Sequence, residues 1–189
     1  MKTMKTNEIH HHVFDTALGP CGVAWSGRGL THVQFADGSP ATTEKRLVGR
    51  SRSAGAAEPP PAVAAVVADI RRYFAGEPVD FSAAAVDLSA IDPFRRKLYE
   101  TMRALKWGET TTYGGLAQRL GATDWEGARD VGLAMGSNRI PIVIPCHRVL
   151  AAGNKLGGFS AYGGTKTKEK LLALEGVRFD GEAPRLPGM

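Results

Sequence analysis

The sequence predicts an α/β N-terminal domain, a small and mostly antiparallel sheet with helix, followed by a mainly α C-terminal domain that contains a helix-turn-helix. Two observations support this fold class. Apolar and polar residues alternate over much of the first 35 residues, as in strands, and short capped helices dominate after residue 90. At 189 residues the chain can hold one large domain or two small ones. The change in character near 87–90 favours two domains, 1–90 and 91–189.

The N-terminal domain is expected to begin with a hairpin. The segment "VFDTALGPCGVAWSGRGLTHVQFA" alternates apolar and polar residues around a turn-prone stretch from Ser26 to Gly29. A short helix is expected around 43–48, before an exposed loop rich in Gly, Ser and Pro. Helical spacing predicts a further helix over 62–74, and "VDFSAAAVDL" is compatible with another strand.

The C-terminal domain is expected to begin with a helix behind Asp92, an N-cap candidate before Pro93. The apolar stripe of this helix is Phe94, Leu98, Met102 and Leu105. A second short helix in "TTYGGLAQRLG" should close at Gly121, and a third should run through "WEGARDVGLAMG" behind a capping box of Thr123 and Glu126. Two short helices joined by a tight glycine-containing turn predict a helix-turn-helix.

One face of this third helix is rich in glycine. Val131 and Ala134 share the face that we expect to be buried. The opposite face holds Arg129, Gly132 and Gly136. Each glycine costs a helix about 1 kcal/mol relative to alanine, so this face needs a compensating role. Small residues permit close approach to another surface, and a lone arginine suits phosphates or a gap in a base stack. A solvated arginine on a weak helix is the alternative.

The net charge of +5 is unevenly distributed. Residues 1–87 carry 9 basic and 9 acidic side chains, whereas residues 88–189 carry 15 and 10. This favours an anionic partner of the C-terminal half, against the alternative of an ordinary basic surface. No apolar run approaches the roughly 18 residues of a membrane helix, and the N-terminus lacks the apolar stretch of a signal peptide. A cytoplasmic protein without a membrane partner is expected.

The cysteine and histidine patterns argue against a metal site. Cys21 and Cys146 lie far apart in the sequence, and a disulfide between them is not expected in the cytosol. Paired Cys-x-x-Cys and His-x-x-x-His spacings are absent, which argues against zinc. The run from His10 to His12 either binds a metal as a cluster or is a solvated terminal segment, and the lack of further ligands nearby favours the second.

The segment "RIPIVIPCHRVL" places a thiol beside an imidazole and a guanidinium. A free cysteine is mostly protonated at neutral pH, so a nucleophilic Cys146 needs a base. His147 is the candidate base, and Glu175 in "LLALEG" is a candidate to orient its ring. Asn138 could fix the loop or the thiol. The alternative is an inert buried cysteine, and in a strand Cys146 and His147 would point in opposite directions.

Four segments in order resemble the successive motifs of the O6-alkylguanine-DNA alkyltransferase family (methylated-DNA–protein-cysteine methyltransferases). They are "GETTTYGGLAQRLG", "ARDVGLAMGSNRIPIVIPCHRV", "GGFSAYGG" and "LLALEG". The match covers about 93–176, and the first half is similar to the family's α/β domain. The resemblance implies repair of double-stranded DNA that bears O6-alkylguanine, by flipping the base into a pocket and moving its alkyl group to the Cys146 thiolate. It further implies a monomer that acts once and needs no cofactor.

The resemblance also implies a role for each matching residue. Cys146 would accept the alkyl group, His147 would act as a base through a water, and Glu175 would orient His147. Asn138 would support the cysteine loop. Tyr113 would assist base flipping and donate a proton toward the guanine.

On the DNA side, the resemblance places the glycine-faced helix in the minor groove. Arg129 would fill the space that the flipped base leaves, with Ala128 and Gly132 beside it on the DNA-facing helix. The loop 157–164 would wall the guanine pocket. The residues expected to line the pocket are Met135, Pro141, Gly157, Ser160 and Tyr162.

Three features depart from the family pattern. Arg139 stands where the family usually has proline, and it would either loosen the cysteine loop or add a phosphate contact. Asp130 puts a carboxylate beside Arg129, and "GGFSAYGG" is longer than the corresponding loop of some members. Asp130 weakens the electrostatic case for DNA slightly, and the longer loop leaves the size of the accepted alkyl group open.

Two other classes of function are the alternatives. A non-enzymatic alkyltransferase-like lesion binder would lack the acceptor cysteine, which this chain has. A cysteine hydrolase that uses Cys146 and His147 would turn over, and it would leave the glycine-faced helix unexplained.

Overall fold

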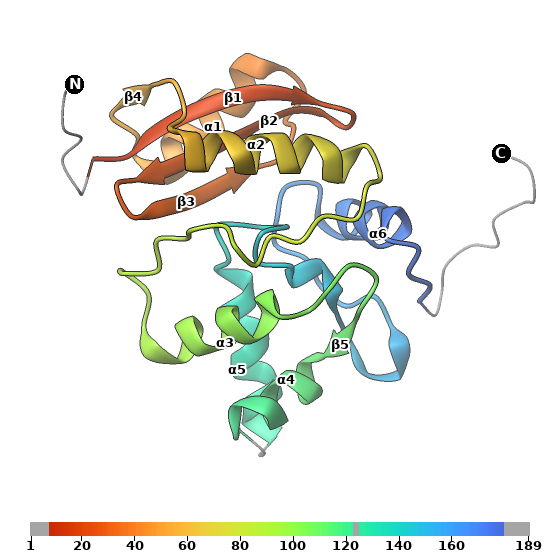
Figure 1. The fold of residues 1–189 in the computed structure, drawn as a ribbon. Coiled ribbons are helices and arrows are strands. Elements are labelled where there is room, and N and C mark those ends of the chain that lie inside the picture. The colour runs from red at the N-terminus through yellow and green to blue at the C-terminus, as the bar shows by residue number, and fades with distance from the viewer. Residues whose placement is uncertain (1–7, 123–124, 180–189) are drawn as a thin grey trace, which may run out of the picture.

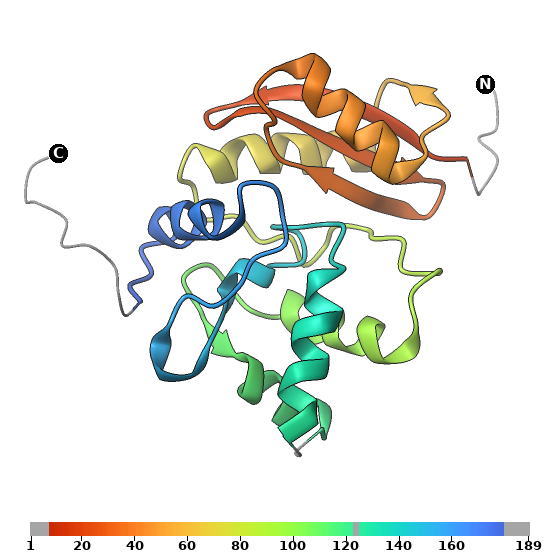
Figure 2. The same ribbon diagram turned by 180° about the vertical axis from the view of Figure 1, so that it is seen from behind.

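The computed structural model describes residues 8–122 and 125–179, with an α/β N-terminal part and a mainly helical C-terminal part, as predicted. The N-terminal sheet has the strand order β3-β2-β1-β4, antiparallel except for the β1–β4 pair. Its strands are β1 (His10–Thr16), β2 (Gly19–Ser26), β3 (Gly29–Gln34) and β4 (Gly55–Ala56). Helices α1 (Pro40–Ser51) and α2 (Pro61–Phe74) lie on opposite faces of the sheet (Figures 1 and 2).

The predicted hairpin joins β2 to β3. Ser26 pairs with Gly29 in antiparallel register. Gly29 has a φ of +136°, and a Cβ added to it would lie 2.6 Å from the backbone of Ala85. Both the backbone conformation and this close contact require glycine at the turn.

The histidine run is part of a strand, which corrects the expectation of a solvated terminal segment. His10, His11 and His12 are the first three residues of β1. The His11 ring is buried, with Nδ1 2.8 Å from the Ser53 hydroxyl and Nε2 2.9 Å from Glu44. Within residues 8–122 and 125–179, no group of three or more His, Cys, Asp and Glu side chains is placed to hold a metal ion.

Both N-terminal helices begin at proline. Ser39 caps α1 by accepting a hydrogen bond from the Thr42 backbone N–H, and Pro40 takes the first helical position. Because of this start signal, α1 is longer than the predicted helix around 43–48. The helix predicted over 62–74 is confirmed as α2. Its expected apolar stripe is buried: Val63, Val66, Val67, Ile70 and Phe74.

The strand considered for "VDFSAAAVDL" is wrong. In this segment only Val86 makes a bridge, to Leu30. The Arg103 guanidinium donates hydrogen bonds to the carbonyl groups of Phe81 and Ser82, at 3.1 and 2.8 Å. These carbonyls are therefore engaged by a side chain, and a ladder with a neighbouring strand does not form.

The C-terminal part is built mainly from helices (Figure 1). Its elements are α3 (Pro93–Arg103), α4 (Tyr113–Leu120), α5 (Trp125–Gly136), α6 (Gly164–Leu174) and the two-stranded pair β5 (Thr111–Thr112) and β6 (Val149–Leu150). Asp92 caps α3 and Gly121 ends α4 in the left-handed conformation, as predicted. The predicted capping box of Thr123 and Glu126 lies outside what the structure describes.

The apolar stripe predicted for α3 is only partly buried. Leu98, Met102 and Leu105 are buried, but Phe94 is 37% exposed. Phe94 lies in the first turn of α3, and residues 93–97 of this turn are all exposed. The helix ends at Arg103, and Leu105 contributes to the core from the following turn.

The two parts share one apolar core. Trp25 and Ile70 of the N-terminal part belong to the same buried cluster as Leu98 and Ile144 of the C-terminal part. The edge strand β3 also contacts the loop before Cys146 directly, because the Val33 backbone N–H donates to the Arg139 carbonyl at 2.9 Å. Over the described residues, no helix is both long enough and apolar enough to cross a membrane.

Candidate active site

Cys146 lies in a tightly held and buried loop. It is the first residue of a 3₁₀ turn, Cys146–Arg148, and its exposed fraction is 4%. Asn138 holds this loop from inside: its amide nitrogen donates to the Ile144 carbonyl at 2.9 Å and to the Cys146 Sγ at 3.2 Å. The amide oxygen accepts a hydrogen bond from the Ile140 N–H at 2.9 Å. The loop is therefore a preformed cradle for the sulfur atom.

The environment of the thiol keeps it protonated at rest. Burial raises the pKa of Cys146 to about 11, and the hydrogen bond from Asn138 and the charge of Lys168 offset only part of this shift. A buried apolar setting disfavours the thiolate because the charge loses its hydration. Reaction at this sulfur therefore requires a base that takes the proton.

His147 is buried beside the cysteine and is hydrogen-bonded to a carboxylate. Its Nε2 lies 2.7 Å from the Glu175 Oε1, and the exposed fraction of the residue is 0%. Burial lowers the pKa of His147, although the contact with Glu175 acts in the opposite direction. The other ring nitrogen, Nδ1, is buried and has no hydrogen-bond partner among the described residues. A neutral His147 thus has one nitrogen tied to a carboxylate and one available.

Glu175 is ionised despite its burial. Arg148 donates from Nε to Oε2 at 2.9 Å and from Nη2 to Oε1 at 3.0 Å, and the Gly108 N–H donates to Oε2 at 3.2 Å. Burial alone would raise the pKa of Glu175, but the hydrogen bonds from His147 and Arg148 and the charge of Arg148 outweigh it and lower the pKa to about 2. The two hydrogen bonds from the Arg148 guanidinium therefore favour the anionic carboxylate.

Tyr73 brings the N-terminal part into this network, although the sequence indicated no site chemistry in the first half. Its hydroxyl donates to the Glu175 Oε1 at 2.7 Å and lies 3.2 Å from the His147 Nε2. The residue is fully buried near the end of α2. No sequence pattern indicates this contact, because Tyr73 lies in an apolar helix and its partner is 102 residues away.

Lys168 is a second residue that sequence reasoning missed. This α6 side chain is fully buried, and its Nζ donates to the Val149 carbonyl at 2.6 Å and to the Gly158 carbonyl at 3.3 Å. Burial lowers the pKa of Lys168 to about 8. Its positive charge lowers the pKa of Cys146, so it favours the thiolate without touching it in a hydrogen bond.

Cys146 opens into a cavity of about 300 Å³. The residues that line it are Tyr113, Gly132, Met135, Gly136, Cys146, Gly158, Phe159 and Ser160. The Tyr113 ring lies between α5 and the loop 157–164. A Cβ added to Gly132 would be 3.8 Å from this ring, and one added to Gly157 would be 3.3 Å from it. The cavity is thus bounded by α4, α5 and the loop.

Three of the residues expected to line the pocket are absent from the described lining of this cavity: Pro141, Gly157 and Tyr162. Pro141 is buried inside the cysteine loop, where it forms a bridge with Ile144. Gly157 lies against the Tyr113 ring rather than at the cavity wall. Tyr162 is directed toward the N-terminal part, as its contacts with α1 show.

The loop 157–164 is anchored to the N-terminal part through Tyr162. The Arg46 guanidinium of α1 lies over the Tyr162 ring, 4.7 Å from its centroid. Arg46 also forms an ion pair with Asp37. Hydrogen bonds from the Tyr162 hydroxyl and from Arg46 lower the pKa of Asp37. The loop 157–164 is therefore held against the N-terminal part by the contacts of Tyr162 with Arg46 and Asp37.

The outer face of α5 has the character that the sequence predicted. Val131 and Ala134 are buried, whereas Arg129 and Gly136 are exposed. Leu133 is 62% exposed, which is unusual for a large apolar side chain. Ala128 lies half-buried beside Arg129.

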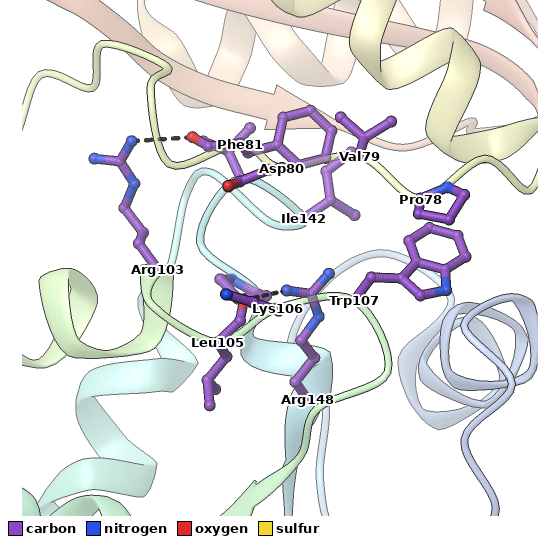
Figure 3. Close-up of a pocket in the computed structure, with 12 residues that line it drawn as sticks. Pro78, Val79, Asp80, Phe81, Arg103, Leu105, Lys106, Trp107, Ile142 and Arg148 are labelled. Atoms are coloured by element: carbon purple, nitrogen blue, oxygen red, sulfur yellow. Dashed lines mark hydrogen bonds between the residues drawn. The ribbon is translucent and has the colours of Figure 1, made fainter.

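A second cavity, of about 240 Å³, lies between the two parts (Figure 3). Its walls come from 78–81, 103–107 and 142–148, and Cys146 is not among the described residues that line it. The guanidinium groups of Arg103 and Arg148 are hydrogen-bonded to the backbone carbonyls of Phe81 and Leu105 (Figure 3). We assign no chemistry to this cavity.

The fold and the site together define a class of protein: an α/β domain packed on a helical domain, with a buried cysteine that faces a cavity beside a histidine–carboxylate pair. Family models match both parts of the chain. The 6-O-methylguanine DNA methyltransferase, ribonuclease-like domain matches residues 9–88, and the DNA binding domain of the same family matches residues 93–177.

Curated and solved relatives cover nearly the whole chain. The methylated-DNA–protein-cysteine methyltransferase of Mycobacterium tuberculosis (strain H37Rv) is 36% identical over 170 residues, 90% of this chain and 94% of that protein. The one from Sulfolobus acidocaldarius is 34% identical over 172 residues, 91% and 96% of the two chains. The structure of Mycobacterium tuberculosis OGT in complex with DNA superposes with a TM-score of 0.70 at 34% identity, covering 88% and 92% of the two chains. This chain belongs to the 6-O-methylguanine DNA methyltransferase family, that of the methylated-DNA–protein-cysteine methyltransferases.

Proposed function

We propose that this protein repairs double-stranded DNA by a single, stoichiometric transfer of the alkyl group of O6-alkylguanine to the Sγ of Cys146. The observation that carries the proposal is the position of Cys146, which lines a cavity of about 300 Å³ beside a buried histidine–carboxylate pair. The names of the relatives support the same activity. No cofactor takes part in the proposed reaction.

The transfer is a displacement at the alkyl carbon. The thiol proton of Cys146 passes through a water to the Nδ1 of His147. Sγ then forms a bond to the alkyl carbon while the bond from that carbon to O6 breaks, and the bonding electrons remain on the guanine. The Tyr113 hydroxyl donates a proton to the departing guanine, and the proton held by His147 passes through solvent to reprotonate Tyr113. The thioether on Cys146 persists, so each protein molecule acts once.

Proton removal and alkyl transfer must be coupled in this site. With a pKa of about 11, the thiolate of Cys146 lies roughly 5 kcal/mol above the thiol at pH 7. A neutral His147 with a free Nδ1 lowers that cost, because the imidazolium that forms is next to the Glu175 carboxylate. Glu175 therefore acts by orienting His147 and stabilising its charged form.

On the DNA side, α4 and α5 act as a helix-turn-helix, with α5 in the minor groove. The target base is flipped into the cavity, and Arg129 takes its place in the stack. The exposed Arg129, the half-buried Ala128 and Gly132 and the exposed Leu133 support this orientation of α5. The DNA-binding and transfer domain is residues 91–189, and residues 1–90 form the other domain.

The experiment that tests the function is a protein mass measurement after mixing with duplex DNA that contains O6-methylguanine. We expect a gain of one methyl group per molecule, located on Cys146. Cys146→Ala should bind the same DNA and gain nothing, whereas Cys21→Ala, which removes the other buried thiol, should still gain the methyl group. An unmodified wild-type protein together with an intact lesion would refute the proposal. Methyl transfer beyond one equivalent would instead indicate a turnover enzyme.

A further inference from the structure

We propose that Tyr73 is a positioning residue for alkyl transfer, contributed by the N-terminal domain to the buried pair of His147 and Glu175. The inference rests on the proposed alkyl transfer. Tyr73 acts through Glu175: its hydroxyl holds the carboxylate in the position from which that carboxylate selects the tautomer and orientation of His147. The transfer site is therefore completed by a residue outside the cysteine-bearing domain.

The geometry around Glu175 Oε1 carries this inference. Three side chains donate to this oxygen: Tyr73 from its hydroxyl at 2.7 Å, His147 from Nε2 at 2.7 Å, and Arg148 from Nη2 at 3.0 Å and Nε at 3.2 Å. All three side chains are buried, so solvent has little access to replace any of them. Loss of one donor leaves a buried charged acceptor less well satisfied, which is costly in a low-dielectric interior.

The same distances settle which atoms carry protons. An ionised Glu175 only accepts hydrogen bonds, so Nε2 of His147 must carry a proton at 2.7 Å from Oε1. Because Nε2 already carries a proton, it offers no lone pair to the Tyr73 hydroxyl. The hydroxyl therefore donates to Oε1. Nδ1 of a neutral His147 is consequently unprotonated, which is the form that accepts the thiol proton. Glu175 thus specifies the reactive tautomer, and Tyr73 holds Glu175 in the position from which it does so.

The ring of Tyr73 is fixed independently of its hydroxyl. It packs edge-on against Trp107, with centroids 5.2 Å apart, and against His147 at 6.3 Å. It also contacts Phe74 and Phe81. Tyr73→Phe retains these ring contacts and removes only the oxygen, so it separates the hydrogen bond from the packing.

The test is the single-turnover methyl-transfer rate of full-length Tyr73→Phe with saturating O6-methylguanine duplex across a range of pH. We expect the rate at neutral pH to fall on the order of tenfold, since a general base contributes about 10²–10⁴-fold and only its orientation is disturbed. We also expect the acid limb of the pH profile to move to higher pH. A Glu175 that has lost one donor attracts a proton on His147 more strongly, and the protonated ring cannot act as the base.

The matched control is Tyr99→Phe. Tyr99 is also buried, and its hydroxyl donates to the Ala134 carbonyl at 2.9 Å, away from Glu175. This variant should lose stability but keep the wild-type pH profile. A Tyr73→Phe protein with the wild-type rate and profile would overturn the inference while the wild-type transfer, measured in the same assay, upheld the proposed function. No transfer by the wild-type protein would instead defeat the function itself.

A second measurement covers the case in which Tyr73→Phe does not fold. The nitrogen-15 shifts of the His147 ring in the wild-type protein report its tautomer directly. We expect a neutral ring protonated at Nε2. A ring protonated at Nδ1 would overturn the inference, because that form has no nitrogen available to the thiol.

Discussion

Asn138 uses all of its polar atoms to shape the cysteine loop. One amide nitrogen bridges the Ile144 carbonyl and the Cys146 sulfur, and the amide oxygen binds the Ile140 N–H. The side chain is buried, so solvent cannot readily replace these contacts. The described backbone of the loop 139–145 belongs to no helix or strand. At the scale of single residues, the hydrogen bonds of Asn138 therefore hold this loop in shape.

We expect Asn138→Ala to destabilise the protein by about 2–4 kcal/mol, because buried hydrogen-bonding groups left without partners cost about 1–3 kcal/mol each. The thiol should also become less reactive, since the hydrogen bond from Asn138 lowers the pKa of Cys146. Urea unfolding and the pH dependence of thiol alkylation measure the two effects. Ser137→Ala is the control, because that residue is exposed and its hydroxyl bonds the Ala134 carbonyl and the Tyr99 hydroxyl, both outside the cysteine loop. Equal stability of the two variants would contradict the role of Asn138.

Helix α5 combines glycines that have opposite requirements. A Cβ on Gly127 would lie 2.3 Å from the Ala122 carbonyl oxygen, a distance that atoms do not adopt. A Cβ on Gly136 would meet nothing within 4 Å. At the scale of the element, Gly127 is thus needed for the close approach to the end of α4, whereas Gly136 is not needed for packing.

We expect Gly127→Ala to lower the free energy of unfolding by more than 2 kcal/mol, because the overlap with backbone cannot be relieved by a side-chain movement. Gly136→Ala should raise it by up to about 1 kcal/mol through helix propensity. Thermal unfolding of both variants tests the contrast. If Gly127→Ala were as stable as Gly136→Ala, the close packing of α4 and α5 would be wrong.

Sequence predicts the helices better than it predicts the junction between the domains. Asp92, Gly121 and the apolar stripe of α2 are local signals, and each of them is confirmed. The segment 79–88 has strand-like residues, but Arg103 engages its carbonyl groups, a tertiary contact that no local pattern reveals. The candidate site likewise combines residues that local sequence reveals with one that only tertiary packing brings in. His147 and Cys146 are adjacent in the sequence, whereas Tyr73 reaches Glu175 only because the two domains pack together.

At the scale of the whole molecule, burial of charged and titratable groups at the domain junction links stability to pH. His32 of β3 is buried. Its ring experiences the positive charges of Arg139 in the cysteine loop and Arg50 in α1. Burial first, and then the charges of these two arginines, lower the pKa of His32 to about 4. The folded protein therefore holds His32 neutral at pH values where the unfolded chain protonates it.

We expect the protein to lose stability as the pH falls from about 6.5 to about 4. In this window the unfolded chain binds a proton at position 32 and the folded protein does not, so the free energy of unfolding decreases with decreasing pH. The contribution of His32 is at most about 3 kcal/mol, and His147, whose pKa burial also lowers, adds to it in the same direction. Urea unfolding at several pH values measures the slope. His32→Gln should make it shallower, and an unchanged slope would show that His32 is not held neutral.

Through the contacts of Tyr162 with Arg46 and Asp37, a wall of the reactive cavity is supported by residues that lie outside the reactive site. The loop that carries Phe159 and Ser160 forms one wall of the reactive cavity, yet its anchor lies on Arg46 of α1 and on Asp37 in the segment before α1. Arg46 therefore supports a wall of this cavity without being one of the residues that line it. The N-terminal part can in this way reshape the cavity wall while Cys146, His147 and Glu175 stay unchanged.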